Sequence, residues 1–287
     1  MSDPIKKCLL VSMFCILCLS LASGCTSKTE KFENHFSQGK EDLEAGKYKK
    51  AEIELKNALQ INPEHAQAYY YLGEVYLKRG NAKNAFQAFH KAANINPDHV
   101  EAQLKTAAFY LRGQRYEDVK QACEAVLKQE PKNTKALLLY SRSLAMQKQF
   151  DQALDYARKA IDSDAKSIEA YIMLGQCLTA LGRMQKAEEA FQQAVNLQDD
   201  SPQARYQLAS FYGLNNNRQK TEQTLKDIIA KYPKDPRHNV NLARFYLRIG
   251  NRELAEEQLT KAVDKAPDNP DLYALLADYY IKTRKVE

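Results

Sequence analysis

The chain has little glycine and proline and no tryptophan. Its 287 residues include 10 glycines and 9 prolines, which are too few for a linker-rich protein, and 44% of the residues are hydrophobic, as in a folded chain rather than a disordered one. The formal net charge of +6 is small, and both signs are mixed along the sequence. A nucleic-acid-binding protein usually concentrates its positive charge, so this class of protein is disfavoured.

The sequence also lacks the short motifs of common catalytic sites. It contains no GxxxxGK[ST] phosphate loop, no HExxH zinc helix and no GxSxG nucleophile turn. Nothing in the residue spacing pairs a nucleophile with a base. We therefore expect no enzymatic activity, no catalytic residue, no cofactor and no metal site.

The N-terminal residues form a separate segment. Lys6 and Lys7 precede the apolar run CLLVSMFCILCLSLA at residues 8–22, which is shorter than the roughly 20 residues of a membrane span and fits an export signal. The following SGC resembles the bacterial lipoprotein signal, in which the cysteine is acylated and becomes the first mature residue. The resemblance implies removal of residues 1–24 and lipidation of Cys25, and Thr26 in place of aspartate implies sorting to the outer membrane. An uncleaved anchor or an ordinary secretory signal is the alternative.

A single period organises the remaining sequence. Prolines occur at positions 63, 97, 131, 233 and 267, and every gap between them is a multiple of 34 residues. A fixed period of this size indicates a solenoid of repeated helical units. After a short linker at residues 25–31, repeats counted from Phe32 fill the chain without insertion. They are 32–65, 66–99, 100–133, 134–167, 168–201, 202–235, 236–269 and a partial 270–287.

The columns of these repeats have distinct chemistry. Position 8 is always small, from Gly39 to Ala277, and position 20 is mostly alanine, so that paired helices can approach closely. Position 15 is glycine in four repeats, which suits the end of a first helix. Proline near position 32 ends the second helix, because proline cannot continue one.

This pattern closely resembles the tetratricopeptide repeat family over residues 32–287. The second repeat carries the resemblance most fully, through Tyr69, Leu72, Gly73, Tyr76, Gly80, Ala85, Phe89, Ala92 and Pro97. Local departures from the family pattern are Gln114, Lys148, Ala165 and Thr221. The resemblance implies an all-α, right-handed superhelical solenoid of seven full helix pairs plus one further helix, and it places Tyr69 in the core.

Three further expectations follow from the repeat positions. Cys123 and Cys177 are separated by the whole fourth repeat, so we expect two buried free thiols rather than a disulfide. His65 and His99 close consecutive repeats, and we expect them in solvated loops. In the last helix we expect Tyr273 on the core face and an apolar outer face, so we also expect the natural chain to continue past residue 287.

The first helices of the tetratricopeptide family line a concave groove, which position 5 faces. In this chain position 5 is apolar in every repeat, and position 6 adds further apolar residues. We expect this surface to bind a helix or an extended segment of a protein partner, while packing inside the repeats is the alternative explanation. The predicted contact residues are Phe36, Tyr70, Tyr71, Leu104, Leu138, Leu139, Ile172, Met173, Tyr206 and Val240.

A basic patch is predicted on the first helix of the seventh repeat. Its residues are Arg237, Asn241, Arg244 and Arg248, which share one helix face. Guanidinium groups bind carboxylates with paired hydrogen bonds, so this patch indicates an acidic contact, and a solvated helix face is the alternative. The lysine and asparagine pattern of the chaperone-tail clamp known in the family is absent from the first two repeats.

The stretches KNALQ (Lys56–Gln60) and AYYYLG (Ala68–Gly73) are similar to tetratricopeptide lipoproteins that accompany exopolysaccharide export and PEP-CTERM sorting. The similarity implies a membrane-anchored scaffold, facing the periplasm from the outer membrane, whose partner is a protein segment of an envelope assembly or secretion system. Lipoproteins of pilus assembly and of outer-membrane-protein assembly share this architecture and remain alternatives. A glycan-binding module, with tyrosines stacked on sugar rings, is the alternative from another class.

Overall fold

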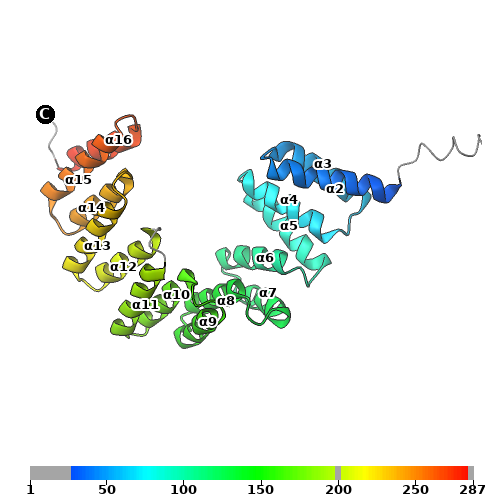
Figure 1. Cartoon of the computed structure of the whole chain (residues 1–287), viewed down its shortest axis with the longest axis horizontal. Helices are drawn as coiled ribbons and strands as arrows, with labels where there is room; N and C mark the ends of the chain where they lie inside the picture. The colour runs from blue at the N-terminus through cyan, green and yellow to red at the C-terminus, as the bar shows by residue number, and fades with distance from the viewer. Residues whose placement is uncertain (1–26, 198–201, 284–287) are drawn as a thin grey trace, which may run out of the picture. The chain divides into compact units, whose positions relative to one another are not determined.

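The computed structural model describes residues 27–197 and 202–283, and all regular secondary structure in these residues is helical (Figure 1). Within these residues, fifteen helices form seven consecutive pairs and one further helix, which confirms the predicted fold. The helices are α2 (Lys28–Glu44), α3 (Tyr48–Ile61), α4 (Ala66–Lys78), α5 (Ala82–Ile95), α6 (Val100–Arg112), α7 (Tyr116–Gln129), α8 (Thr134–Met146), α9 (Phe150–Ser163), α10 (Ile168–Ala180), α11 (Met184–Leu197), α12 (Pro202–Leu214), α13 (Arg218–Lys231), α14 (Pro236–Arg248), α15 (Arg252–Lys265) and α16 (Pro270–Thr283).

The helices keep the period of 34 residues. The first helices from α4 onward begin at residues 66, 100, 134, 168, 202, 236 and 270, and the second helices begin at 48, 82, 116, 150, 184, 218 and 252. The chain divides into two compact units, residues 1–129 and 130–287. Among the described residues the first unit holds α2–α7 and the second holds α8–α16, and each unit is considered by itself.

The first helix starts earlier than the sequence predicted. Residues 25–31 were expected to be a linker, but α2 begins at Lys28. The cause is a side-chain cap: Ser27 Oγ accepts a hydrogen bond of 3.0 Å from the backbone N–H of Glu30, which satisfies one of the donors that a helix start leaves unpaired. The lipidation residue Cys25 and the export signal lie outside the described residues.

The two helices of every pair are joined by the same left-handed turn. Position 15 has a positive φ in all seven pairs, at Gly46, Gly80, Gly182 and Gly250 and also at Gln114, Lys148 and Asn216. The next residue's N–H donates to the carbonyl of position 11 at 2.7 to 2.9 Å in each pair. This bond is the long bond of a Schellman cap. The turn therefore forms even where glycine is missing.

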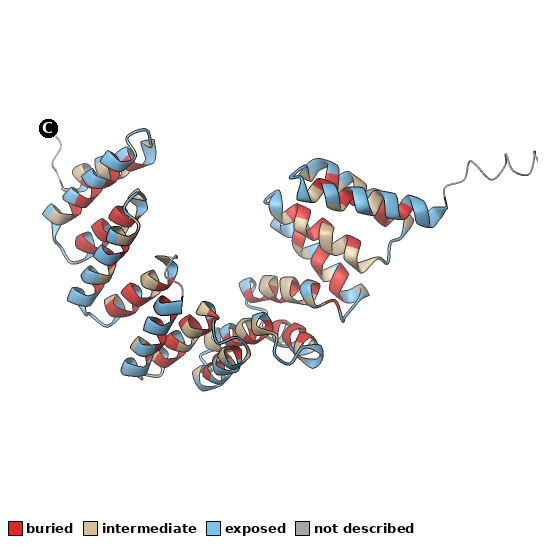
Figure 2. Ribbon diagram, viewed as in Figure 1, coloured by how far each residue is buried: buried red, intermediate tan, exposed pale blue. Residues whose placement is uncertain are grey.

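Each pair is closed by contact between position 8 and position 24. A Cβ added to Gly39, Gly73 or Gly175 would lie 2.7 to 2.8 Å from side-chain atoms of Leu55, Phe89 or Phe191, respectively. In the other repeats position 8 is alanine or serine and position 24 is smaller than phenylalanine, as in Ala107 and Cys123. The buried residues accordingly lie where helices face one another (Figure 2).

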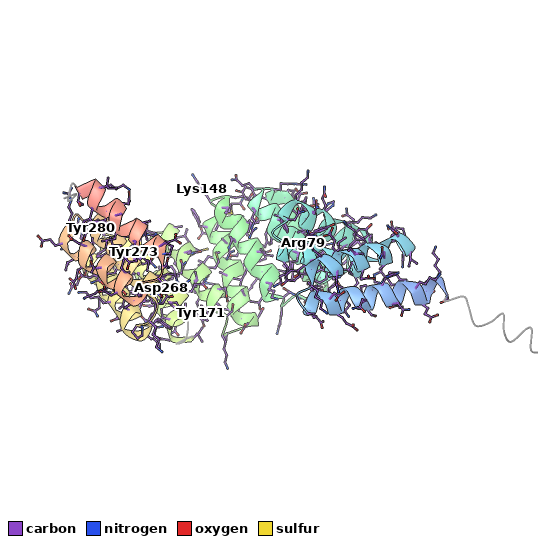
Figure 3. The ribbon with its side chains drawn as sticks, turned by 90° about the horizontal axis from the view of Figure 1, so that it is seen from above. Arg79, Lys148, Tyr171, Asp268, Tyr273 and Tyr280 are labelled. Carbon is purple, nitrogen blue, oxygen red and sulfur yellow. The ribbon has the colours of Figure 1, made fainter. Side chains whose placement is uncertain are left out.

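Successive repeats are joined by hydrogen bonds between tyrosine and glutamate. The hydroxyl of Tyr246 donates to Glu222 Oε1 of the preceding repeat at 2.7 Å, and Tyr212 donates to Glu188 Oε1 at the same distance. In the first unit Tyr76 contacts Glu52 at 3.4 Å, and Glu52 also pairs with Arg79, which is labelled in Figure 3. The tyrosines and glutamates of these bonds are half-buried or buried, so the bonds stabilise the contact between repeats.

The predicted orientation of Tyr273 in helix α16 was wrong. Tyr273 was predicted to face the core, but its side chain is 48% exposed (Figure 3), whereas Leu272 and Tyr279 are buried. In the second repeat Tyr69 occupies the same position and packs beside Ala92 and Ala93 of its own second helix. No second helix follows α16 in the described residues, so nothing there covers Tyr273.

Replacing Lys148 with glycine is expected to stabilise the fold. Lys148, labelled in Figure 3, holds a φ of 62°, a region that costs most side chains about 1–2 kcal/mol and glycine nearly nothing. Allowing for the greater freedom of glycine in the unfolded chain, we expect Lys148→Gly to raise stability by about 0.5–1 kcal/mol in urea denaturation. Gly80→Ala, at the equivalent turn, should lower the stability. A Lys148→Gly variant that is no more stable than the parent would contradict this account of the turn.

Acid should weaken the bonds between repeats. Hydrogen bonds from Lys226 and then from Tyr246 lower the pKa of Glu222, so its contribution is full above the unfolded pKa of about 4.3 and is lost as the pH falls through the lower folded value. We expect Tyr246→Phe to reduce stability at pH 7 by about 1–2 kcal/mol and to narrow the difference in stability between pH 7 and pH 3.

Tyr171→Phe is the matched control for this change, because no described residue supplies a hydrogen-bond partner to the Tyr171 hydroxyl (labelled in Figure 3). Equal effects of the two substitutions on the thermal midpoint would show that the hydrogen bond to Glu222 does not join the repeats.

Candidate functional site

Four aromatic rings form a row on α2 and α4 in the first unit. Phe32 and Phe36 have ring centroids 5.6 Å apart, Phe36 and Tyr71 are 5.8 Å apart, and Tyr71 and Tyr70 are 5.6 Å apart. We call these four residues the aromatic row. Phe32 is buried, and the other three are half-buried. The predicted contact residues Phe36, Tyr70 and Tyr71 thus form one connected surface with accessible edges.

Two histidines contact the aromatic row. Both lie in loops, as predicted, but they are not solvent-exposed, since His65 is half-buried and His99 is buried. His65 Nδ1 accepts a hydrogen bond of 3.1 Å from the N–H of Ala68, and its ring lies 5.0 Å from that of Phe36. His99 is buried, its Nδ1 accepts from Ala102 at 3.3 Å, and its ring lies 5.1 Å from that of Tyr70. Both histidines are helix N-caps. The sequence carried this signal, because three other repeats place Asn133, Ser167 and Asp235 at the same position.

The N-cap role requires the Nδ1 atom of each imidazole to carry no hydrogen, since a protonated nitrogen cannot accept a hydrogen bond. Burial lowers the pKa of His65, which favours this neutral form.

Charged groups surround the aromatic row. Lys40 Nζ lies 5.3 Å from the ring centroid of Tyr71, and Lys105 Nζ pairs with Glu74 Oε1 at 2.7 Å. Burial and then the nearby Glu74 raise the pKa of Tyr70 to about 12, so its hydroxyl stays protonated and able to donate. Leu104 on α6 is half-buried in the same unit. The surface therefore joins apolar faces with polar edges, as contact surfaces for proteins do.

In the second unit the predicted contact residues divide into two groups. Leu138, Leu139 and Tyr206 are half-buried, but Ile172, Met173 and Val240 are buried at 8%, 4% and 6% exposure. Helix α10 contacts both α8 and α12, which closes the face that carries Ile172 and Met173. Val240 packs into a cluster with Ala262, Val263 and Leu272. Ile172, Met173 and Val240 are therefore core residues. For them the alternative explanation, packing inside the repeats, is correct.

A cavity of about 350 Å³ lies between α12 and α14 in the second unit. Its walls carry Tyr206 and Ser210 from α12 and Asn241, Arg244, Phe245 and Arg248 from α14, and Ala209, Thr221 and Leu225 complete its lining. We call this cavity the arginine pocket. It brings Tyr206 from the predicted contact column together with three of the four residues of the predicted basic patch.

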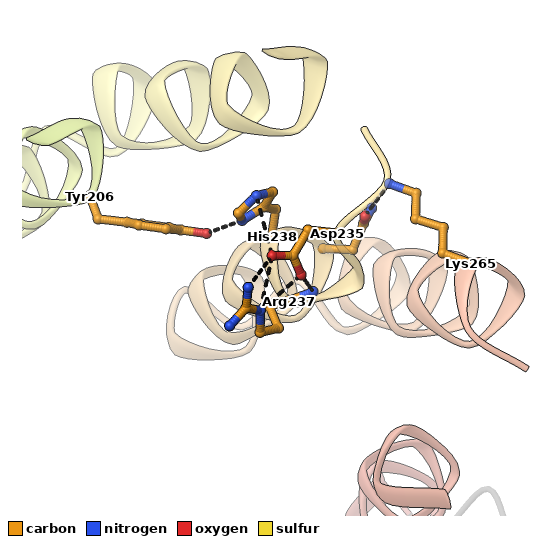
Figure 4. A network of polar contacts seen from close by, with 6 residues as sticks. Tyr206, Asp235, Arg237, His238 and Lys265 are labelled. Carbon is orange, nitrogen blue, oxygen red and sulfur yellow. Dashed lines mark hydrogen bonds and ion pairs between the residues drawn. The ribbon is translucent and has the colours of Figure 1, made fainter. Parts of the chain in front are cut away.

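The fourth residue of that patch lies elsewhere. Arg237 donates to both carboxylate oxygens of Asp235, with bonds of 2.5 to 2.9 Å (Figure 4), and its side chain is 84% exposed. This contact lowers the pKa of Asp235 to about 2. Arg237 does not line the arginine pocket, because the preceding aspartate that caps α14 holds its guanidinium at the helix start.

A buried histidine positions the tyrosine of the pocket. The Tyr206 hydroxyl lies 2.6 Å from His238 Nδ1 (Figure 4), and His238 is only 4% exposed. Burial lowers the pKa of His238 and raises that of Tyr206, so the tyrosine donates and the neutral imidazole accepts. The His238 Nε2 atom lies 3.8 Å from Asp235 Oδ2. Sequence reasoning missed His238, because a single histidine in a helix carries no spacing signal.

Other reactive groups in the described residues are enclosed. Cys123 and Cys177 are buried free thiols, and burial raises their pKa values to about 12 and about 11. No three histidine, cysteine or acidic side chains within residues 27–197 and 202–283 are grouped as a metal site. Over the same residues no helix has the length and apolar character of a membrane span.

Several solved structures resemble this chain in fold. A tetratricopeptide repeat protein from Parabacteroides merdae ATCC 43184 superposes with a TM-score of 0.70 at 15% identity, covering 87% of this chain and 99% of that one. The type IV pilus biogenesis factor PilW gives 0.61 at 18% identity, with 70% and 94% covered. PilF of Pseudomonas aeruginosa gives 0.57 at 16% identity, with 72% and 95% covered. At these identities the likeness is one of fold.

Sequence models of protein families agree with the structural likeness. Residues 23–161 match the tetratricopeptide domain of cytochrome c-type biogenesis protein H, and residues 144–211 and 214–279 match the tetratricopeptide repeat. No curated protein matches the chain in sequence. The chain is therefore built of tetratricopeptide repeats, a fold that serves as a scaffold for protein interaction.

Proposed function

We propose that this chain is a membrane-anchored scaffold that binds a segment of a protein partner on the faces of its first helices. The observation that carries the proposal is the aromatic row, in which three of four connected rings remain half-buried. Aromatic side chains supply large contact areas at small entropic cost and are enriched at binding surfaces. Leu104 in the first unit and the arginine pocket in the second extend the available contacts.

The anchoring part of the proposal rests on the N-terminal sequence. The basic start, the apolar run and SGC support lipidation at Cys25, and Thr26 supports the outer membrane with the repeats facing the periplasm. Two or three acyl chains hold a protein on a bilayer stably, whereas one chain binds reversibly. The sequence stretches KNALQ and AYYYLG support a role in exopolysaccharide export or PEP-CTERM sorting.

Pilus assembly is the second candidate pathway. It is favoured by the likeness to PilW and to PilF of Pseudomonas aeruginosa, each of which is covered over more than nine-tenths of its own length. The same architecture suits the assembly of outer-membrane proteins. All of these candidates share one mechanism, in which the repeats of each unit present the faces of their first helices to a segment of another protein.

Partner capture should depend on the aromatic row. We expect Tyr71→Ala combined with Leu104→Ala to weaken capture of the partner at least tenfold, because both side chains are half-buried and the apolar area that they offer to a partner is lost. The measurement is retention of cross-linked envelope proteins by the full chain in detergent, identified by mass spectrometry. Tyr171→Ala removes a ring of the same size from outside the predicted contact columns and should retain the partner.

Retention of purified polysaccharide with no protein would contradict the scaffold and support the glycan-binding alternative, since aromatic rings also stack on sugars. Equal loss of capture in the Tyr171→Ala control would show that the effect is one of stability.

Lipidation should depend on a single sulfur atom. We expect Cys25→Ser to move the chain out of the membrane fraction, because serine cannot form the thioether to the lipid. The measurement is the distribution of the chain between membrane and soluble fractions, together with its mass. An unchanged membrane fraction would support an uncleaved anchor instead.

A further inference from the structure

We propose that the arginine pocket between α12 and α14 binds the carboxylate of an acidic side chain, so that the partner segment held by the second unit is an acidic peptide. The inference rests on the proposed function, because it names the chemistry of the segment that the scaffold binds.

The two arginines of the pocket have no counter-ion among the described residues. Arg244 and Arg248 make no ion pair with any described residue, whereas Arg79, Arg115 and Arg237 each pair with a carboxylate. No acidic side chain lines the pocket. The two guanidinium groups lie one turn apart on α14, where like charges repel. An incoming carboxylate relieves this repulsion as well as accepting hydrogen bonds.

The guanidinium of Arg248 is held between two neighbours. The Cζ atom of Arg248 lies 5.8 Å from the ring centroid of Phe245, a contact that favours a cation over an aromatic face. On the other side, a Cβ added to Gly213 of α12 would lie 3.0 Å from Arg248 Nη2. Glycine at this position therefore leaves the space in which the guanidinium lies against α12.

The rest of the lining has suitable chemistry. The Asn241 amide hydrogen-bonds to Tyr206 and keeps a second N–H donor, while the Tyr206 hydroxyl donates to His238. Ala209, Leu225 and Phe245 supply apolar surface. Donors above an apolar lining match a side chain with a methylene stem and a carboxylate end. A volume of about 350 Å³ is at the lower end of ligand sites and suits one or two side chains.

Peptide binding tests the inference directly. The full chain in detergent is titrated with two fluorescein-labelled decapeptides, one alternating glutamate with leucine and one with glutamine in place of every glutamate, and polarisation is measured. We expect the glutamate peptide to bind at least tenfold more tightly, and this preference to fall as salt is raised. Arg244→Gln and Arg248→Gln should each remove most of the preference.

Two further variants separate the pocket from general charge. Arg237→Gln removes the same charge from the same helix outside the pocket and should leave the preference unchanged. Gly213→Ala changes no charge, but it displaces the Arg248 guanidinium and should weaken the glutamate peptide several-fold.

Each contrary outcome has a distinct meaning. Equal binding of the two peptides, or an equal loss in Arg237→Gln, would overturn the pocket while leaving the scaffold intact. Binding of an oligosaccharide of uronic acids in place of the peptide would overturn the peptide as the ligand. Unchanged partner capture by the variant that combines Tyr71→Ala with Leu104→Ala would overturn the scaffold, regardless of the result of peptide binding.

Discussion

The rest of the structure depends on how closely the two helices of each repeat approach at positions 8 and 24. Where position 8 is glycine, the side chain of Leu55, Phe89 or Phe191 occupies the space that a Cβ would need. This contact sets the spacing within a pair, and the spacing sets where the next repeat packs. Positions 5 and 6 of the first helices then keep a fixed place relative to the core. The proposed partner surface is thus a consequence of core packing, as is usual when short repeats stack.

Much of the fold follows from the sequence, because similar residue types recur at the same positions of successive repeats. The small residues at position 8 and the glycines at position 15 predict the close approach and the turn. Gln114 and Lys148 adopt the same left-handed conformation without being glycine. The packing of the two helices that the turn joins therefore also determines its conformation. The early start of α2 was missed, because a serine cap before a charged stretch is a weak signal beside a strong period.

The candidate site was less accessible to sequence reasoning. Position 5 is apolar in every repeat, yet Ile172 and Val240 are buried while Tyr70 and Tyr206 are half-buried. The difference depends on how neighbouring helices close over each residue, which the residue type does not encode. Arg237 shares a helix face with Arg244 and Arg248, but its local pairing with Asp235 depends on the cap of α14. The role of His238 became clear only from its hydrogen bond with Tyr206, whereas the N-cap roles of His65 and His99 could have been inferred from the capping residues at the same position of other repeats.

The two units offer different chemistry on the faces of their first helices. The first unit places aromatic rings at positions 5 and 6, supported by histidine caps, and the second places unpaired arginines beside Tyr206. In the proposed function, the first unit favours apolar side chains of a partner and the second unit favours acidic ones. Tyr206 and Arg248 are each held by a neighbour, His238 and Phe245 respectively, that the repeat pattern does not fix.

The central claim is that a protein partner lies on the faces of the first helices, and the chain's own tyrosines can test it. Hydroxyl-radical footprinting of the full chain, with and without its cross-linked partner, measures the solvent access of each ring. The account predicts slower oxidation of Tyr71 and Tyr206 in the complex and unchanged oxidation of Tyr116 and Tyr156 on the second helices. Protection confined to Tyr116 and Tyr156 would contradict it.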